Sequence, residues 1–199
     1  MNKMFAQYTD TQLWQAFTTG NKEALSYIYL QHYKYLINYG IRLYSKEEVV
    51  EDCIHDIFTE LWQRRKSTTH LLSIRLYLLK ALRNKIYSYL KKQQTSLDVN
   101  LYTDNYHFTV EYSFEENLIR ELGDEELKRK LVCALNQLSA RQKEAIYLRF
   151  YNNLDYEQIA MVMGISNQSI RTHVYQAIKL LREKLAVELT LVALLLKLL

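Results

Sequence analysis

The stretch MGISNQSIRTH, residues 163–173, interrupts an apolar helical pattern with one glycine and a run of polar residues. Gly164 can adopt the positive φ that ends a helix, and Ser166 is placed to cap the N-terminus of the next helix. The flanking segments LDYEQIAMVMG and ISNQSIRTHVYQAIKLLREKL both have helical patterning. The sequence therefore predicts two helices joined by very few residues, which is a helix-turn-helix.

The second of these helices has two distinct faces. Its apolar positions predict one buried stripe, made of Ile170, Val174, Ala177, Ile178, Leu181 and Leu185. Another face carries hydrogen-bonding side chains at i, i+3, i+4 and i+7, namely Gln168, Arg171, Thr172 and Tyr175. Side chains of this kind reach base edges and phosphates in a DNA major groove. The pattern favours a DNA-recognition helix over the alternative, an ordinary helical corner.

The composition predicts an all-α protein with one or two small domains. The chain has 199 residues, 49% of them hydrophobic, with no proline and only four glycines. Long amphipathic stretches fill the sequence and leave little strand or hairpin signal. Its two cysteines have no metal-ligand spacing, and no secretory signal sequence begins the chain, so we expect a cytoplasmic protein.

Charged residues are strongly segregated along the chain. Leu61 to Leu97 contains nine basic residues and no acidic one, whereas Asp98 to Glu126 contains nine acidic residues and only Arg120 as a base. Basic blocks of this kind indicate contact with a polyanion. Ordinary solvated helix faces are the alternative for either block alone.

The sequence divides into four segments. Residues 1–93 read as helices, with starts near Thr9 to Thr11 and at Asn21, an acidic-faced helix at residues 49–65 and a basic, tyrosine-rich helix from about residue 71 to 92. Residues 94–113 lose the helical period and form the predicted linker, and residues 114–188 regain it with four helices. The apolar tail, residues 189–199, is shorter than the roughly 20 residues that cross a bilayer. We expect it to pack on its own domain or on a partner.

Both halves of the chain resemble the extracytoplasmic-function (ECF) sigma factors, small alternative specificity subunits of bacterial RNA polymerase. The C-terminal half, with LSARQKEAIYLRFYNNLDYEQIAMVMGIS before the recognition helix, resembles their region 4 domain. The segments TDTQLWQAFTTGNKEALSYIYLQHY, VVEDCIHDIFTELWQRR and LLSIRLYLLKALRNKIYSYLKK resemble their region 2. The resemblance spans about residues 9 to 186 and implies two helical domains, region 2 at 1–93 and region 4 at 114–188.

The resemblance implies three binding surfaces. The first surface binds the clamp helices of the polymerase's largest subunit, and the resemblance assigns this contact to Asp52, Asp56, Glu60, Trp62 and Gln63. Binding and melting of the minus-10 promoter element fall on Arg75, Tyr77, Lys80, Arg83, Asn84, Tyr87, Lys91 and Lys92. Binding of the minus-35 element as duplex falls on Gln168, Ser169, Arg171, Thr172 and Tyr175, with Arg141 and Lys143 on phosphates. Exposed aromatic rings can stack on unpaired bases, but Tyr77 and Tyr87 suit a core position equally well.

The family pattern also defines the expected partners. These are core RNA polymerase, promoter DNA and an anti-sigma factor, which in the family is often membrane-bound; no cofactor and no small-molecule substrate are expected. The sequence departs from the commonest pattern at Gln168, His173 and Gln176 in the recognition helix, and at His55 and Ser88 in region 2. The promoter sequence therefore does not follow from the resemblance.

Two other functions compete with a sigma factor. A conventional helix-turn-helix regulator that binds duplex DNA by itself accounts for the turn, but not for an acidic helix followed by a basic aromatic one. A nucleic-acid enzyme requires a catalytic constellation, and the sequence has no glycine-rich phosphate loop and no metal-spaced histidines or cysteines. We therefore expect a binding protein and not an enzyme.

Overall fold

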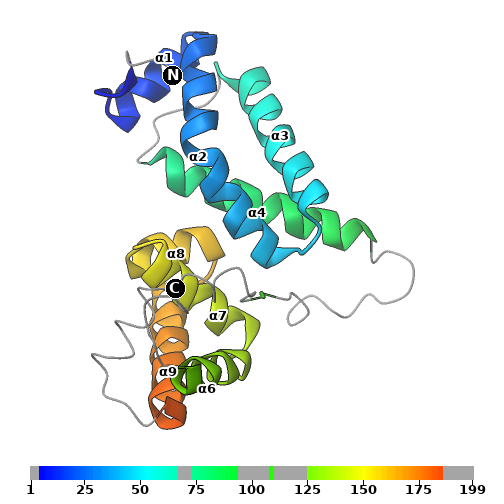
Figure 1. Cartoon of the computed structure of the whole chain (residues 1–199). Coiled ribbons are helices and arrows are strands. Elements are labelled where there is room, and N and C mark those ends of the chain that lie inside the picture. Colours follow the sequence, from blue (N-terminus) through cyan, green and yellow to red (C-terminus); the bar gives the residue numbers. More distant parts are fainter. Residues whose placement is uncertain (1–4, 67–72, 94–107, 110–124, 186–199) are drawn as a thin grey trace. The chain divides into compact units, whose positions relative to one another are not determined.

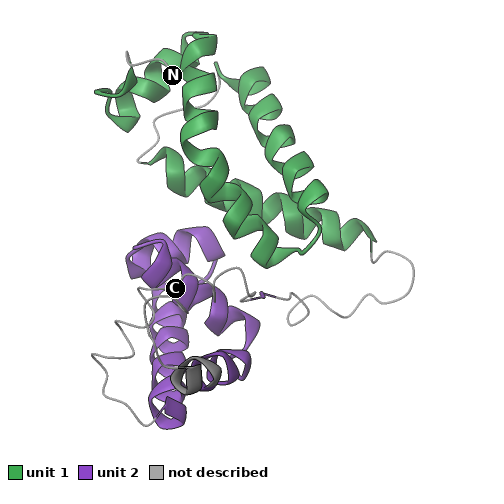
Figure 2. Cartoon of the chain, viewed as in Figure 1, with its two compact units in different colours: residues 1–105 green, residues 106–199 purple. Residues whose placement is uncertain are grey.

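The computed structural model describes residues 5–66, 73–93, 108–109 and 125–185. Within these ranges the regular secondary structure is entirely helical. The chain forms two compact units, residues 1–105 and 106–199 (Figure 2). The predicted all-α, two-domain fold is thus confirmed. The predicted linker, residues 94–113, lies outside the described residues except at Phe108 and Thr109, and the apolar tail, residues 189–199, lies entirely outside them.

The first unit consists of α1 (Asp10–Thr18), α2 (Lys22–Leu43), α3 (Glu47–Arg64) and α4 (Ile74–Gln93) (Figure 1). Helix α2 packs against the other three, and α3 also contacts α4. Both predicted helix starts are confirmed. The Thr9 hydroxyl accepts the Gln12 amide at 3.3 Å in a capping box, and Asn21 Oδ1 accepts the Ala24 amide at 3.1 Å.

Helix α3 has the two faces that its sequence predicts. Its core-facing residues are Val50, Cys53, Ile54, Ile57, Phe58 and Leu61, all of them buried. Trp62, which the pattern places with this stripe, is only half-buried, and the carboxylates of Asp52, Asp56 and Glu60 are exposed. Packing therefore determines which side of α3 remains available to a partner.

The second unit contains α6 (Glu125–Asn136), α7 (Ala140–Ile146), a π-helical turn (Tyr147–Tyr151), α8 (Tyr156–Met163) and α9 (Asn167–Leu185). Helix α9 packs against α6, α7 and α8. Ser139 caps α7 in a capping box with Gln142, at one predicted break. Asn153, at the next predicted break, has a φ of 52°. The break predicted at Gly123 lies outside the described residues.

Phe108, near the start of the second unit, packs against that unit. Its side chain is 2% exposed, and its ring centroid lies 5.5 Å from that of Tyr147 in the π-helical turn. Phe108 falls inside the range predicted as linker, so at this residue the chain is already packed. The bounds of the linker stay a prediction.

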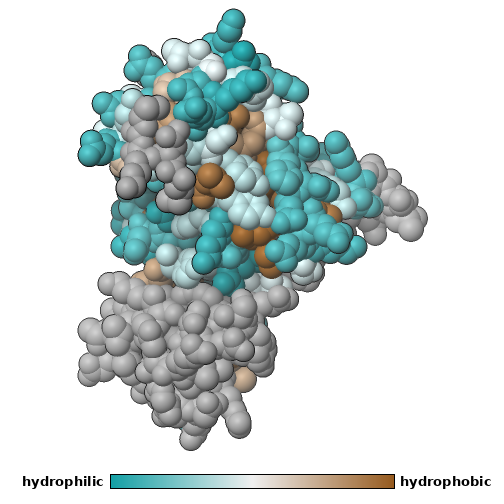
Figure 3. Space-filling model, turned by 45° about the horizontal axis from the view of Figure 1, so that its top comes forward, coloured by the Kyte–Doolittle hydropathy of each residue, from teal (hydrophilic) through white to brown (hydrophobic). Residues whose placement is uncertain are grey.

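On the face shown in Figure 3, the hydrophobic side chains of the described residues form small patches among hydrophilic ones. Among the described residues, the large hydrophobic side chains that are exposed are Tyr8, Leu30, Tyr151, Met161 and Tyr175. Single exposed apolar side chains are normal in globular proteins. Only Tyr175 among them belongs to a predicted binding surface.

Gly40 lies where α2, α3 and α4 meet. A Cβ atom at this position would overlap Val50 Cγ1 of α3 and lie 3.3 Å from Leu82 Cδ2 of α4. Val50 and Leu82 are both fully buried, so neither can move into solvent. Glycine here therefore permits a close approach of helices, at the cost of helix propensity.

Replacing Gly40 tests this packing. We expect Gly40→Ala to lower the free energy of unfolding by up to about 2 kcal/mol, because an overpacking cost of about 1–3 kcal/mol outweighs the roughly 1 kcal/mol gain in helix propensity. Chemical denaturation measures the change. The double variant Gly40→Ala, Val50→Ala should lose less stability than the sum of the losses in the two single variants, because Val50→Ala removes the Cγ1 atom that the new Cβ would overlap. Additive losses would contradict the proposed overlap.

Candidate nucleic-acid and protein-binding surfaces

The helix-turn-helix has the predicted geometry. Gly164 has a φ of 67° and its amide donates to the Ala160 carbonyl at 2.9 Å, which ends α8. The Ser166 hydroxyl accepts the Ser169 amide at 3.1 Å and so caps α9. Asp155 caps the start of α8 in a capping box with Gln158. Each turn of the motif is therefore fixed by hydrogen bonds of its own residues.

Helix α9 separates a buried stripe from an exposed polar face. Its buried residues are Ile170, Val174, Ala177, Leu181 and Leu185; Ile178, predicted with them, is half-buried. Gln168, Arg171 and Thr172 are exposed, and Tyr175 is 69% exposed. Ser169 is half-buried, with its hydroxyl 2.8 Å from that of Ser166. Four of the five predicted recognition residues on α9 thus lie at the surface.

Two of the exposed side chains are held by their own helix. Arg171 Nε donates to Asn167 Oδ1 at 3.0 Å, and the Thr172 hydroxyl donates to the Gln168 carbonyl at 3.0 Å. The Thr172 hydroxyl is therefore engaged, which leaves its methyl group for apolar contact such as that with a thymine methyl. The Arg171 guanidinium keeps further donors for an acceptor on DNA.

Tyr156 connects Arg171 to a second arginine. The guanidinium carbons of Arg149 and Arg171 lie 5.1 Å and 4.8 Å from the centre of the Tyr156 ring. Arg149 Nη1 also donates to the Leu154 carbonyl at 2.9 Å. Both guanidiniums are thereby held against one aromatic ring and keep their charge. Sequence reasoning missed both Arg149 and Tyr156, because the π-helical turn between α7 and α8 removes any regular spacing.

Helix α7 places two further basic residues near the recognition helix. Arg141 and Lys143 are half-buried, and burial lowers the pKa of Lys143. Burial, together with the nearby positive charge of Arg141, lowers the pKa of His173 on α9. Gln142 Nε2 donates to Gln176 Oε1 at 3.3 Å, which links the two helices. The side chains of Arg141 and Lys143 thus have less conformational freedom than those of fully exposed lysines and arginines.

In the first unit, α3 and α4 line a groove of about 830 Å³. Asp52, Asp56 and Glu60 line it from α3, and Asn84 and Lys92 line it from α4. The acids assigned to polymerase and part of the set assigned to the minus-10 element therefore meet at one groove. Gln63 is exposed, and Trp62 lies under the Arg65 guanidinium, 4.3 Å from its ring centre.

Lys85, a residue that the sequence interpretation did not assign, bridges the two walls of this groove. Its ammonium lies 3.2 Å from Asp56 Oδ2 and donates a short hydrogen bond to Glu60 Oε1. Burial alone would lower the pKa of Lys85, but the hydrogen bonds that Lys85 donates to Glu60 and Asp56 outweigh burial and raise it. Two of the three acids, Asp56 and Glu60, are thus partly neutralised within the unit.

The basic residues of α4 fall into two groups. Arg75 lies over the Tyr35 ring at 4.1 Å, and Arg83 over the Tyr87 ring at 4.5 Å; all four side chains are half-buried. Tyr77 is half-buried, with its ring centre 5.8 Å from that of Trp14. The exposed members of the predicted minus-10 set are Lys80, Asn84, Lys91 and Lys92. Arg75 and Tyr77 therefore contribute to packing, whatever else they contact.

His55 packs against α2 although it is exposed. Its ring stacks with that of Tyr29 at 6.0 Å between centroids, and its Nε2 lies 3.1 Å from the Tyr29 hydroxyl. His55 also lines the groove between α3 and α4, as Lys85 does. His55 therefore helps to orient α3 and is not part of the set predicted for polymerase.

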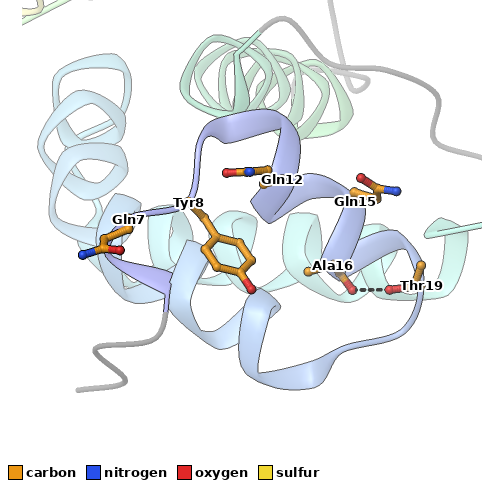
Figure 4. Close-up of a pocket in the computed structure, with 6 residues that line it drawn as sticks. All are labelled: Gln7, Tyr8, Gln12, Gln15, Ala16 and Thr19. Carbon is orange, nitrogen blue, oxygen red and sulfur yellow. Dashed lines mark hydrogen bonds between the residues drawn. The ribbon is translucent and has the colours of Figure 1, made fainter.

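A second hollow, of about 570 Å³, lies along α1 (Figure 4). It is lined by Gln7, Tyr8, Gln12, Gln15, Ala16 and Thr19, none of which is a carboxylate, imidazole, thiol or amine. Across the described residues, no three histidine, cysteine or acidic side chains are grouped to hold a metal ion. The helices in those same ranges include none that is long and apolar enough to span a bilayer.

Comparison with known proteins matches both units to one family. Residues 28–96 match the family model for sigma-70 region 2, and residues 128–181 match the model for sigma-70, region 4. These ranges lie in the first and second unit, respectively. They contain α3 and α4 in one unit and the helix-turn-helix in the other.

Two curated relatives come from Bacillus subtilis (strain 168). RNA polymerase sigma factor SigV is 40% identical over 55 residues, which cover 28% of this chain and 33% of SigV. RNA polymerase sigma factor YlaC is 24% identical over 161 residues, which cover 79% of this chain and 89% of YlaC. The match to SigV thus spans about a third of that protein, whereas the match to YlaC spans most of it.

Two solved structures share the fold. The sigma factor RpoE in complex with the anti-sigma factor NepR, from Bartonella quintana, has a TM-score of 0.57 and 24% identity, covering 83% of this chain and 99% of that one. CnrH in complex with the cytosolic domain of CnrY has a TM-score of 0.56 and 17% identity, covering 89% of this chain and 94% of CnrH. At these identities the comparison supports the fold alone.

A two-unit helical chain with a polar-faced helix-turn-helix in one unit defines a DNA-recognition protein. This chain belongs to the sigma-70 family of RNA polymerase sigma factors, within its ECF branch. Sigma factors direct transcription initiation as recognition subunits of RNA polymerase and are not enzymes.

The Lys85 bridge predicts a pH-dependent contribution to stability. We expect Lys85→Met, which keeps the apolar stem, to lower the free energy of unfolding by at most about 1 kcal/mol, because Asp56 and Glu60 are more than half-exposed. The folded-state pKa is raised above the ordinary value of 10.5, so this contribution is complete below pH 10.5 and lost as pH rises through the folded pKa. Thermal unfolding between pH 8 and about 12 measures it.

The exposed Lys80 on the same helix provides the control. Lys80→Met should leave stability nearly unchanged at every pH, because a single exposed charge contributes little. Equal losses in the two variants, or a Lys85→Met loss that persists unchanged at the highest pH, would contradict a specific bridge.

Proposed function

We propose that the two units of this sigma factor use three surfaces to select and open promoters. Helix α3 binds core RNA polymerase through Asp52, Asp56, Glu60 and Gln63, with Trp62 in support. Helix α4 engages the minus-10 element, and α9, with Arg141 and Lys143 from α7, binds the minus-35 element as duplex. The energy for melting comes from binding, and no cofactor or small-molecule substrate is involved.

The groove between α3 and α4 is the observation that carries this proposal. Exposed carboxylates of α3 form one wall, and Asn84 and Lys92 of α4 form the other. A protein partner with basic groups fits the acidic wall, and a polyanion fits the exposed lysines of α4. The first unit can therefore bind polymerase through the acids of α3 and DNA through the lysines of α4. Each partner then contacts side chains of the opposite charge.

The exposure of side chains on α4 favours particular roles at the minus-10 element. Lys80, Lys91 and Lys92 are exposed and suited to phosphates, and Asn84 is exposed and suited to a base edge. The other members of the predicted set are half-buried, in cation–ring or ring–ring contacts; they are Arg75, Tyr77, Arg83 and Tyr87. A role of Tyr77 or Tyr87 in stacking on a base requires the ring to leave part of its present packing.

The other partners follow from the relatives. Because RpoE and CnrH are bound to NepR and CnrY in their structures, we propose that an anti-sigma factor restrains this chain as well. We propose that this regulator is membrane-bound and binds through a cytosolic segment, since CnrH is bound to the cytosolic domain of CnrY. We also propose a cytoplasmic location. Cys53 and the exposed Cys133 are both free thiols, and free thiols are typical of a reducing compartment.

Reconstituted transcription tests the proposal as a whole. Purified core RNA polymerase should initiate at specific sites on genomic fragments only when this protein is added, and the protein alone should bind those fragments weakly. Tight specific binding without polymerase, together with no gain in initiation, would instead identify a conventional helix-turn-helix regulator.

The recognition helix can be tested at Arg171. We expect Arg171→Ala to reduce initiation from promoters with a minus-35 element by about 5- to 150-fold, because a bidentate arginine contact to a base is worth about 1–3 kcal/mol. Run-off transcription at subsaturating protein measures the loss. The control is Arg182→Ala, an exposed arginine on the same helix about 16 Å further along. Equal losses in both variants would show a non-specific charge effect.

The acidic face of α3 can be tested at Asp52. We expect Asp52→Lys to weaken binding to core RNA polymerase by roughly tenfold, with unchanged affinity of the second unit for minus-35 duplex. Fluorescence anisotropy with labelled protein and core polymerase measures the affinity. Glu23→Lys makes the same charge change at an exposed position of α2 and should leave it unchanged. Equal weakening by both variants would contradict a surface on α3.

A further inference from the structure

The first amide of α4 is bonded to a residue far away in sequence. Ile74 N–H donates to Asp10 Oδ2 of α1 at 3.0 Å, across 64 residues. Ser73 precedes the helix and accepts the Tyr77 amide, so Ile74 is the first helical residue. Its amide has no partner within α4, because the first amides of any helix lack one. Helix α4 is thus capped in part by another helix.

Asp10 stands at the start of two helices. It is the first residue of α1, where Thr9 and Gln12 form the capping box, and its carboxylate also meets the N-terminus of α4. Both helix N-termini carry partial positive charge, which one carboxylate stabilises. The Ile74 side chain is completely buried, which anchors this end of α4 in the core, whereas Asp10 is exposed.

Two ring contacts hold the same turn of α4. The Trp14 ring of α1 packs on Tyr77, and the Tyr35 ring of α2 lies under Arg75 at 4.1 Å. The charges of Asp10 and Arg75 both act on His32 of α2. Burial lowers the pKa of His32, the negative charge of Asp10 opposes this shift, and the positive charge of Arg75 adds to it. Helices α1 and α2 therefore converge on the first turn of α4, and Asp10 makes the backbone contact.

The position of this turn matters for the rest of α4. Lys80 and Asn84, both exposed, follow Ile74 by six and ten residues, about 9 and 15 Å along the helix. A change in the start or tilt of α4 moves these side chains relative to the groove shared with α3. Fixing one end of the helix reduces the conformations that must be excluded when DNA binds.

We infer that Asp10 is a positioning residue for promoter opening, which acts on DNA only through the N-terminus of α4. The inference rests on the proposed role of α4 at the minus-10 element. Asp10 itself contacts neither DNA nor polymerase in this mechanism. Its carboxylate holds Ile74, and α4 then presents Lys80 and Asn84 in one orientation.

The test uses the full-length protein with core RNA polymerase, on a promoter that the wild-type protein opens. We expect Asp10→Ala to reduce open-complex formation by about fivefold, the factor that corresponds to the roughly 1 kcal/mol typical of a lost helix cap, while core binding stays within about twofold. Permanganate reactivity of minus-10 thymines measures opening. Asp10→Asn keeps an acceptor oxygen without the charge and should recover part of the loss.

Asn21→Ala is the matched control, because Asn21 caps a different helix, α2, through the Ala24 amide. It should lower thermal stability by a similar amount and leave opening unchanged. If Asn21→Ala and Asp10→Ala reduce opening equally at equal stability, Asp10 has only a general structural role and the inference is overturned.

Hydrogen exchange separates the local contact from its effect on transcription. Exchange at the Ile74 amide should become faster in Asp10→Ala and stay unchanged in Asn21→Ala; unchanged exchange in Asp10→Ala would overturn the inference without any use of polymerase. If the wild-type protein fails to open promoters, the proposed function is contradicted and the promoter role of Asp10 falls with it. If the wild-type protein opens promoters and Asp10→Ala opens them equally well, the inference about Asp10 is contradicted and the proposed function is not.

Discussion

The close approach of α2, α3 and α4 at Gly40 is the constraint on which the first unit depends. Val50 of α3 and Leu82 of α4 occupy the space that a larger residue would fill, and both are completely buried. This contact fixes the rotation of α3 and α4 about their own axes, because a helix that buries one stripe exposes the opposite one. The acids of α3 and the lysines of α4 reach the surface as a consequence.

Charged side chains in both units are held by contacts that do not neutralise them completely. Tyr35 restrains Arg75, Tyr156 restrains Arg149 and Arg171, and Lys85 lies between two carboxylates. A cation over an aromatic ring keeps its charge for a partner while it loses conformational freedom beforehand. Less entropy is then lost when DNA or polymerase binds. Both units thus prepare their charged groups in the free protein.

Local sequence signals predicted most of the helices and the whole turn of the helix-turn-helix. Thr9, Asn21 and Ser166 cap helices at the expected positions, and Gly164 has the expected positive φ. These features depend on residues within four positions of each other, so they can be read directly from the chain. The contact of Arg83 with Tyr87 is of the same kind, since i and i+4 share a helix face.

What the sequence by itself determined is therefore the set of helices, their apolar stripes, the order of the two units and the family. Only the tertiary structure decided which charged residues are restrained, as with Asp10 at Ile74, Lys85 at Asp56 and Glu60, and Tyr156 under two arginines. The reason is physical: helical periodicity reveals which face of a helix is buried. Contacts between helices depend on their rotation and approach, which arise from packing of the entire core.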